Sequence, residues 1–390
     1  MKPVGIDALS FYAPAYALDL QILADVRGVA REKFSTGLGQ DVMAVAPPDE
    51  DIVTMGASAA LPLLEAHGRE DIDLLIFATE TGVDQSKSAA LFVHGLLDLP
   101  DRCRAVEMKE ACYAATAGLQ LAADWVARHP GRRALIIGAD IARYELRSPG
   151  EPTQGAGAVA MLVSEQPRLL ALDPEAGYHA EDVMDFWRPN YRGEALVDGQ
   201  YSTRVYLQTL LSAWDQYAEA SGRSLDDFAH NCFHLPFTRM ADKALQRLWR
   251  HALHREAKPE EIAARLGSSQ AYNRLTGNTY TASLYEGLGA LLDHAPASLA
   301  GSRIGLFSYG SGCMAEFFSG VVASGFERHV RAAEHRDMLA GRTLLEYQQY
   351  EDMFQLPFPC DGGEHIFAQY RTGPFRLSGV SQHRRLYEAV

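Results

Sequence analysis

The sequence predicts a layered α/β protein. Apolar runs of strand length alternate with longer stretches in which apolar residues recur at helical spacing, and small residues mark the turns between them. The same order of strand, turn and helix returns in the second half of the chain. Because this alternation is typical of helices packed on a sheet, we expect a fold of sheet and helix layers.

The first half contains the clearest elements. Residues 73–79, Asp-Leu-Leu-Ile-Phe-Ala-Thr, are apolar after the first position and predict a buried strand. Helices are expected over 51–66 and 86–97, and another follows Cys112, because apolar residues from Leu119 onward recur at helical spacing. The remaining strands expected here span 6–11, 103–108, 134–138 and 157–163.

The second half repeats the pattern. The segment 177–199, rich in aromatic and polar residues, is expected to be an elaborated surface segment between the halves. The tail beyond Gly325 is helical and charged at first, whereas 357–374 is rich in Gly and Pro and permits no assignment. We divide the chain into halves 1–170 and 171–390, packed as one unit. The expected helices of the second half span 201–220 and 238–254, and its strands span 228–233, 303–308 and 315–323.

Composition and charge exclude several classes of function. The 390 residues are 47% hydrophobic and carry a formal net charge of -14, which argues against a general nucleic-acid binder. An anionic ligand would therefore need a local basic patch. The five cysteines are widely spaced and form no CxxC pair, so we expect no disulfide framework, no metal site and a reducing cytoplasm. The sequence shows neither a signal peptide nor an apolar run of membrane-spanning length, and we expect no membrane segment.

Cys112 is the first candidate catalytic residue. It lies between a predicted strand and a predicted helix, where unpaired backbone N–H groups and the helix dipole favour a thiolate. An arbitrary cysteine is more often a small buried residue. The neighbouring alanines at 111, 114 and 115 leave room for a bulky group to approach, which favours the reactive role.

Two further groups lie at the ends of predicted strands. Glu80 directly follows the strand 73–79, and burial there would raise the pKa of its carboxyl and suit it to proton transfer. His234 directly follows the strand 228–233, and Pro236 comes two residues later. Each residue alone has a more common interpretation, a solvated loop glutamate or a core histidine. Because ligands of open α/β sheets bind beyond the carboxyl ends of strands, Glu80, Cys112 and His234 could converge.

A glycine turn supplies a fourth element. In 307–313, Phe-Ser-Tyr-Gly-Ser-Gly-Cys, backbone N–H groups at a strand end could join that of Cys112 in binding an oxyanion, although a simple hairpin turn is equally compatible. A dinucleotide site is not indicated, since no G-x-G-x-x-G joins a strand to a helix.

A series of motifs covers nearly the whole chain. In order and spacing, the chain resembles the 3-hydroxy-3-methylglutaryl-CoA synthase family of the thiolase superfamily, in its bacterial mevalonate-pathway type. The resemblance implies the layered αβαβα thiolase fold, with two related halves and the site at their junction. The motifs are Ala-Thr-Glu at 78–80, Glu-Ala-Cys-Tyr-Ala-Ala-Thr at 110–116, and the segments 150–160, 181–189, 232–237, 277–283 and 307–312.

The resemblance also implies a reaction, in which acetyl-CoA condenses with acetoacetyl-CoA and the enzyme thioester is hydrolysed. Cys112 would carry the acetyl group, Glu80 would be the general base and acid, and His234 would contact the acetoacetyl carbonyl. CoA thioesters are the substrates, and no metal or separate cofactor is implied. The further substrate-binding positions implied are Asp140, Tyr144, Thr153, Asn278 and Ser311.

For CoA, the helix after His234 offers Arg239, Lys243 and Arg247 at intervals of four residues, of which Arg239 and Lys243 are the expected contacts. A solvated basic face is the competing interpretation. Arg239 stands where related bacterial sequences often carry lysine, so its contact geometry would differ. The family further implies a homodimer.

Two alternatives remain open at this point. The first is a synthase that adds β-branches in polyketide assembly and uses acyl carrier proteins in place of CoA. The second is an inactive acyl-CoA-binding scaffold, which the intact set of Cys112, Glu80 and His234 argues against.

Overall fold

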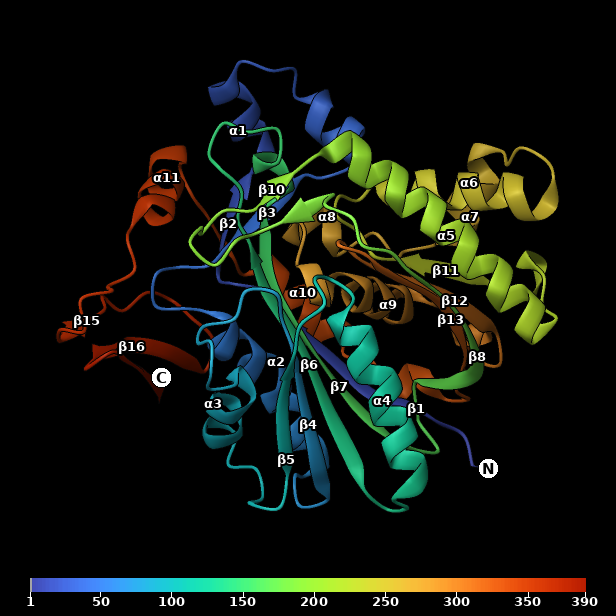
Figure 1. The fold of residues 1–390 in the computed structure, drawn as a ribbon, viewed down its shortest axis with the longest axis horizontal. Helices are drawn as coiled ribbons and strands as arrows, with labels where there is room; N and C mark the ends of the chain where they lie inside the picture. Colours follow the sequence, from blue (N-terminus) through green and yellow to red (C-terminus); the bar gives the residue numbers. More distant parts are fainter. Residues whose placement is uncertain (1) are drawn as a thin grey trace.

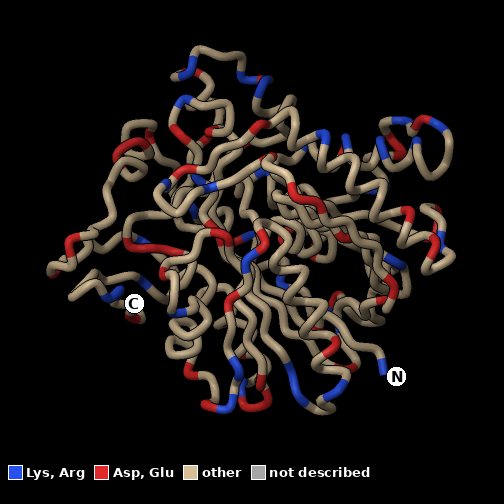
Figure 2. The backbone as a smooth tube through the Cα atoms, in the orientation of Figure 1, with Lys and Arg blue, Asp and Glu red and all other residues tan. Residues whose placement is uncertain are grey.

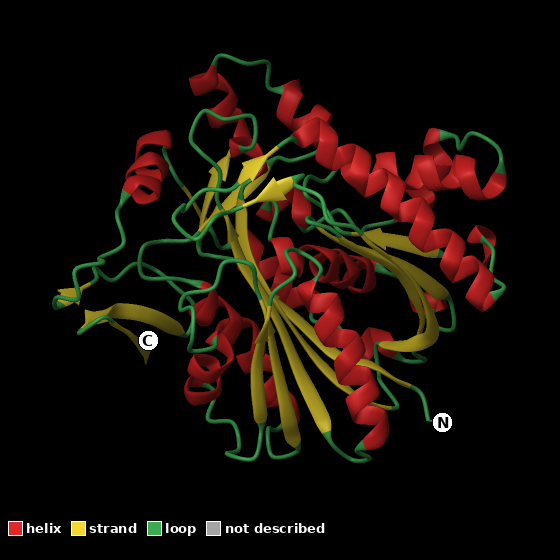
Figure 3. Ribbon diagram, in the orientation of Figure 1, coloured by secondary structure: helices red, strands yellow, loops and turns green. Residues whose placement is uncertain are grey.

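The computed structural model describes residues 2–390 and forms five layers in the order α, β, α, β, α (Figure 1, Figure 3). Helices α2 (Ile52–His67) and α3 (Ala89–Leu96) cover the outer face of the first sheet region. Helices α4 (Ala114–Arg128) and α9 (Ser283–His294) lie between the two sheet regions. Helices α5 (Gly199–Ser221) and α6 (Met240–Leu253) cover the opposite outer face. The expected layered αβαβα fold is confirmed.

One nine-stranded mixed sheet runs through both halves in the order β11-β12-β13-β8-β1-β7-β6-β4-β5. The two regions join where β1 meets β8, through the pairs Gly5↔Ala171 and Ile6↔Leu170. Strand β4 pairs in parallel with β5 and β6, and β11 pairs in parallel with β12. The strands are β1 (Val4–Tyr12), β4 (Ile72–Ala78), β5 (Arg104–Met108), β6 (Arg133–Ala142), β7 (Gly155–Glu165), β8 (Leu170–Ala180), β11 (His230–Phe233), β12 (Arg303–Gly310) and β13 (Met314–Val322).

The central helices are apolar on the faces that meet both sheet regions. Leu119, Ala122 and Val126 of α4 pack in one core cluster with strand residues such as Ile76 and Ile136. These side chains recur at helical spacing, which is why the local sequence is sufficient to predict this helix. The burial places the start of α4, and therefore Cys112, at the centre of the molecule.

The prediction that 177–199 is a surface segment holds for much of its length, including the exposed Met184 and Tyr191, but not for its start or for a few buried side chains. Its first residues extend β8, and Gly177 packs so closely on α5 that an added Cβ would lie 2.0 Å from the carbonyl oxygen of Ala213. Val183 and Asp185 are buried. A short hairpin of β9 (Phe186–Trp187) and β10 (Leu196–Val197) follows. The segment is therefore exposed over much of its length and is anchored to the interior by a few buried side chains.

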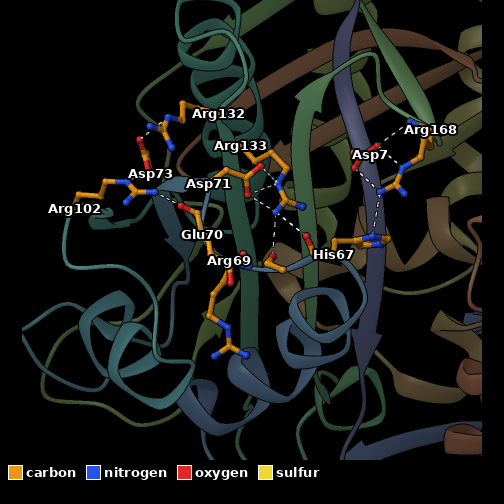
Figure 4. A network of polar contacts seen from close by, with 11 residues as sticks. Asp7, His67, Arg69, Glu70, Asp71, Asp73, Arg102, Arg132, Arg133 and Arg168 are labelled. Atoms are coloured by element: carbon orange, nitrogen blue, oxygen red, sulfur yellow. Dashed lines mark hydrogen bonds and ion pairs between the residues drawn. The ribbon is translucent and has the colours of Figure 1, made fainter.

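A charged network lies at the end of the sheet where β4 and β6 begin (Figure 4). Arg133 Nε donates to Asp71 at 2.8 Å, and Asp73 pairs with Arg102 and Arg132 at 2.8 and 3.3 Å. Glu80 and Cys112 follow the opposite, carboxyl ends of β4 and β5. The network therefore joins strand starts far from the candidate catalytic groups.

The tail begins with helices, as predicted, and then forms strands that the sequence did not indicate. Strands β16 (Phe375–Ser381) and β17 (Arg384–Ala389) form a hairpin near α2 and α3. Arg376 anchors it through a buried ion pair with Asp49, with 3.1 Å between Nε and Oδ2. The other tail elements are α10 (Ala332–Ala340), β14 (Thr343–Leu344), α11 (Tyr347–Gln355) and β15 (His365–Ile366).

A small three-stranded sheet lies beside the main one. Strand β2 (Tyr16–Asp19) pairs with β3 (Val42–Val45) and with β14. Helix α1 (Leu20–Arg27) follows β2 and contacts α11. Among residues 2–390, every helix is too short or too polar to cross a membrane.

Candidate active site

Cys112 lies between the end of β5 and the start of α4, as predicted. Tyr113 is the N-cap residue of α4, and Ala111 adopts a positive φ of 42° just before the cysteine. This conformation is uncommon outside glycine and bends the chain sharply. The side chain of Cys112 consequently lines an internal cavity of about 430 Å³.

Glu80 directly faces the cysteine. The Cys112 Sγ lies 3.7 Å from Glu80 Oε2, and the thiol is the donor. Burial, together with the nearby charge of Asp140, raises the pKa of the Glu80 carboxyl to about 8. A carboxyl group with this pKa can both take up and release a proton near neutral pH.

The ionisation of Cys112 differs from the expectation based on the helix terminus. Burial, followed by the charges of Glu80 and Asp140, raises the pKa of the thiol well above its usual value. Cys112 is therefore a thiol that donates to a carboxyl group, and nucleophilic attack requires loss of that proton to a base.

Asp140 lies behind Glu80 and does not line the cavity, in contrast to the expectation of a cavity-lining position. It is fully buried. One carboxylate oxygen accepts from the backbone N–H of Glu80 at 2.9 Å and from the hydroxyls of Thr79 and Thr81 at 2.8 and 2.7 Å. The other accepts from the hydroxyl of Thr281 at 2.6 Å. Asp140 thus holds the Glu80 turn and raises the pKa of its carboxyl.

His234 enters the same cavity from the end of β11. Its backbone N–H donates to Phe307 O at 2.8 Å, and its carbonyl accepts from the Tyr206 hydroxyl at 2.8 Å. Burial lowers the pKa of the imidazole to about 3, so the ring is neutral at physiological pH. Within residues 2–390, His234 Nδ1 has no hydrogen-bond partner.

The glycine turn lies beside the cysteine loop. An added Cβ on Gly310 would lie 2.5 Å from Glu110 O, so only glycine permits this approach. The buried carboxylate of Asp185 holds the turn by accepting from the Tyr309 hydroxyl at 2.6 Å and from Gly312 N–H at 3.0 Å. Ser311, between them, lines the cavity.

The cavity brings together most of the positions predicted from the sequence. Besides the catalytic candidates, its wall contains residues from the β6–β7 loop, the 278–280 turn and the glycine turn. Glu80 is reached through Cys112, and Asp140 supports it from behind. The predicted positions that line the cavity are Cys112, Tyr144, Thr153, His234, Asn278 and Ser311.

The two predicted CoA contacts lie outside the cavity wall. Lys243 is exposed, with its Nζ 4.8 Å from the ring centroid of Phe237, which itself lines the cavity. Arg239 is also exposed and pairs with Asp242 at 2.8 Å. Basic and acidic segments are interspersed over the rest of the molecule (Figure 2). Both cations are therefore near the cavity without touching its inner end.

Sequence reasoning assigned no role to three residues of the site. Asp185 and Arg188 lie in the motif 181–189, and membership of this motif was the only indication in the sequence that they belong to the site. The Arg188 guanidinium donates to the backbone carbonyl of Glu80 and lowers the pKa of its carboxyl, against the larger effect of burial. Tyr280 is buried at the cavity with a positive φ of 45°.

The arrangement supports acyl transfer followed by proton abstraction. It combines a cysteine nucleophile, a carboxyl base in contact with it and a neutral imidazole able to donate to a carbonyl oxygen. Residues 2–390 contain no cluster of three or more His, Cys, Asp or Glu side chains arranged to hold a metal ion.

Comparison with known proteins gives a consistent result. The family model for the hydroxymethylglutaryl-coenzyme A synthase N-terminal region matches residues 1–167, and that for the C-terminal region matches 171–267 and 255–357. The hydroxymethylglutaryl-CoA synthase of Enterococcus faecalis is 46% identical, covering 98% of this chain and 99% of that protein. A crystal structure of an HMG-CoA synthase complexed with CoA superposes with a TM-score of 0.94 at 41% identity and covers 100% of both chains.

A more distant relative acts on a different carrier. The polyketide biosynthesis 3-hydroxy-3-methylglutaryl-ACP synthase of Bacillus subtilis is 33% identical, covering 91% of this chain and 89% of that protein. The identity to the Enterococcus protein is 13 percentage points higher, the difference between 46% and 33%.

Proposed function

The chain belongs to the hydroxymethylglutaryl-CoA synthase family, and we propose that it condenses acetyl-CoA with acetoacetyl-CoA through an acetyl-Cys112 intermediate. It is an acyltransferase of that family. The products are 3-hydroxy-3-methylglutaryl-CoA and free CoA, and the pathway is the mevalonate route to isoprenoids. The observation that carries the mechanism is the contact of Cys112 Sγ with Glu80 Oε2 at 3.7 Å, in which Cys112 lines the same cavity as His234 and Glu80 lies directly behind it.

The first step is acetyl transfer to the cysteine. The Cys112 thiol gives its proton to Glu80 while its sulfur attacks the acetyl carbonyl, and the bond from that carbon to the CoA sulfur breaks. Glu80 passes the proton to the departing CoA thiolate. The backbone N–H groups of Cys112 and Ser311 stabilise the oxyanion of the tetrahedral intermediate.

The second step is carbon–carbon bond formation. Glu80 removes a proton from the methyl group of the acetyl thioester, and the resulting carbanion attacks the ketone of acetoacetyl-CoA. The neutral imidazole of His234 donates a hydrogen bond to the ketone oxygen, while Asn278 supports the acetoacetyl group. Glu80 returns its proton to the alkoxide. Water then hydrolyses the bond to Cys112, releasing the carboxylate product and restoring the thiol.

The proposal is tested by assaying acetoacetyl-CoA consumption that depends on acetyl-CoA. The expected result is stoichiometric 3-hydroxy-3-methylglutaryl-CoA, with radioactive acetyl label recovered on Cys112 when acetoacetyl-CoA is omitted. An inactive binding scaffold would acquire no label. Cys112→Ala should lose both the label and the product, because no other described cysteine side chain lines the cavity.

Carrier choice is the nearest alternative, since the Bacillus relative is named for an acyl carrier protein. The higher identity to the Enterococcus protein favours CoA, and Arg239 and Lys243 near the cavity supply cations for CoA phosphates. Turnover of acetoacetyl-CoA should exceed that of acetoacetyl carrier protein. A strong preference for the carrier protein would refute the choice of CoA.

We also propose that two copies associate, in the cytoplasm, through the free edge of β5. This strand ends the sheet, and apolar side chains are exposed along it and on the flanking helices: Val106 on β5, Leu91 on α3 and Leu121 on α4. An open edge favours strand pairing. Val106→Lys should increase the fraction of monomer in sedimentation experiments, and an unchanged sedimentation coefficient would refute this interface.

The halves 1–170 and 171–390 are proposed to fold as one unit.

A further inference from the structure

One wall of the cavity is a loop that needs external support. Residues 143–154 connect β6 to β7 and contain little regular structure apart from the single turn Glu151–Thr153. Six of them line the cavity: Tyr144, Glu145, Ser148, Pro149, Gly150 and Thr153. Irregular segments of this length are mobile unless other elements hold them, so the position of this wall depends on what packs behind it.

Behind the loop runs a continuous chain of hydrogen bonds that ends on the tail helix α11. The backbone N–H of Tyr144 donates to Gln154 Oε1 at 2.8 Å. Gln154 Nε2 donates to the Tyr350 hydroxyl at 2.8 Å, and that hydroxyl donates to Glu151 Oε1 at 3.2 Å. Tyr350 therefore joins both ends of the lining segment to α11.

Helix α1, which lies beside α11, adds a further contact to these hydrogen bonds (Figure 1). Arg27 Nη2 and Nε donate to the two oxygens of Glu151 at 2.6 and 2.8 Å, which forms a bidentate pair. Glu151 also accepts from the backbone N–H of Arg147 at 2.8 Å. The carboxylate is thus fixed by a helix on one side and by Tyr350 on the other.

The chain is buried and its hydrogen bonds are directional. Tyr350, Gln154 and Glu151 are 2%, 5% and 1% exposed. Because the Tyr350 hydroxyl must donate to a carboxylate, it accepts from the Gln154 NH₂ group, and the Gln154 oxygen must then face Tyr144. None of these three side chains lines the cavity in the described part of the chain, so they act on a bound acyl group only through the loop.

We propose that Tyr350 is a positioning residue for the acyl-binding wall, setting the placement of Tyr144 and Thr153 through Gln154 and Glu151. This proposal rests on the proposed function in one respect: it assumes that the acyl group binds against that wall. Without the hydroxyl, the buried amide and carboxylate each lose a partner and the amide is free to rotate. A displacement of about 1 Å can cost about 100-fold in rate, so a smaller shift of the wall should lower kcat/KM by about tenfold. Because the wall binds the acyl group and carries no reacting atom, most of that loss should be in KM.

The test compares Tyr350→Phe with Tyr217→Phe. Tyr217 is a matched control because its buried hydroxyl also lies within hydrogen-bonding distance of a side chain, Ser319 Oγ at 2.8 Å, but Tyr217 does not line the cavity formed by the described residues. In Tyr350→Phe we expect the KM for acetoacetyl-CoA to rise about tenfold with a smaller change in kcat. Tyr217→Phe should keep both constants at wild-type values, with a comparable loss in Tm.

Hydrogen exchange gives a second measurement that does not depend on activity. Backbone amides of 143–154 should exchange faster in Tyr350→Phe and in Glu151→Gln than in the control, because both variants remove a bond of the chain. Unchanged exchange in this segment, or equal KM values in Tyr350→Phe and Tyr217→Phe, would overturn the positioning role. Wild-type protein without turnover would refute the proposed function, while the exchange experiment would still decide the role of Tyr350.

Discussion

Replacing Glu80 with Gln tests the separation of the two chemical steps. The substitution keeps the size of the side chain but removes the base that lies 3.7 Å from Cys112 Sγ. A positioned general base contributes about 10²- to 10⁴-fold, so condensation should fall by that factor, or about 3 to 5 kcal/mol of activation free energy. Acetylation should persist within about tenfold of the wild-type rate.

The physical reason for retained acetylation is electrostatic. The Glu80 carboxylate is one of the charges that raise the pKa of the Cys112 thiol, so its removal makes the thiol more acidic. A more acidic thiol can lose its proton to water, which partly replaces the missing base. Proton abstraction from the acetyl methyl group has no such substitute, because a carbon acid requires a strong base held in position.

Two assays separate these steps. Acetylation is measured by the rate at which radioactive acetyl label from acetyl-CoA appears on the protein, and condensation by the loss of acetoacetyl-CoA. Glu80→Ala should behave like Glu80→Gln in both. Condensation by either variant within tenfold of the wild-type rate would refute the assignment of Glu80 as the base, as would loss of label with condensation retained.

Three further predictions concern the pH dependence set by Glu80, the role of His234 and the stability of the C-terminal hairpin. Because burial and Asp140 raise the pKa of the Glu80 carboxyl to about 8, kcat/KM for condensation should rise with pH through that value as the base form accumulates. Asp140→Asn should move the rise to lower pH, and a pH profile flat from 6 to 9 in the wild type would contradict both expectations. His234→Ala should raise the KM for acetoacetyl-CoA at least about tenfold while acetyl labelling is retained, because in the proposed mechanism the imidazole contacts only the second substrate; loss of labelling would exclude that role. Arg376→Ala should lower the free energy of unfolding by about 3 to 5 kcal/mol in urea titrations, because it leaves the buried Asp49 carboxylate unpaired, and a change below about 1 kcal/mol would show that water reaches the pair.

The sequence predicted the catalytic candidates because each lies at the end of a readable strand. Glu80 follows the apolar strand β4, His234 directly follows β11, and Cys112 precedes a helix with clear periodicity. In each case the signal is local, since strand and helix periodicity depend on neighbours in the chain. The resemblance to a family then related the three residues to one reaction.

Within the segment 177–199, which is exposed over much of its length, local pattern was misleading at individual positions. Its polar residues indicated a surface position, yet Asp185 is fully buried. The burial depends on hydrogen bonds from Tyr309 and Ser202, which lie 124 and 17 residues away in the chain. A polar side chain is buried only where distant partners satisfy it, and periodicity carries no information about those partners.

The ionisation state of Cys112 also lay beyond local reasoning, whereas the raised pKa of Glu80 was predicted from its position after a buried strand. The helix terminus at Cys112 predicted a stabilised thiolate, whereas the structure surrounds the sulfur with buried carboxyl groups that raise its pKa. Likewise Asp140, expected in the cavity wall, lies behind Glu80 and controls it through backbone and threonine contacts. Both outcomes depend on residues brought together from separate strands.

By itself, the sequence determined most of the strands and helices of the central layers, the layered class of fold and the presence of a nucleophile, a carboxyl base and an imidazole close to strand ends. Only the tertiary structure decided that the sulfur and the carboxyl lie 3.7 Å apart, that the imidazole is neutral, and that a tail helix supports the cavity wall through Tyr350. The physical reason is that periodicity is a property of neighbouring residues. Distances, desolvation and shared hydrogen bonds arise only when distant segments pack together.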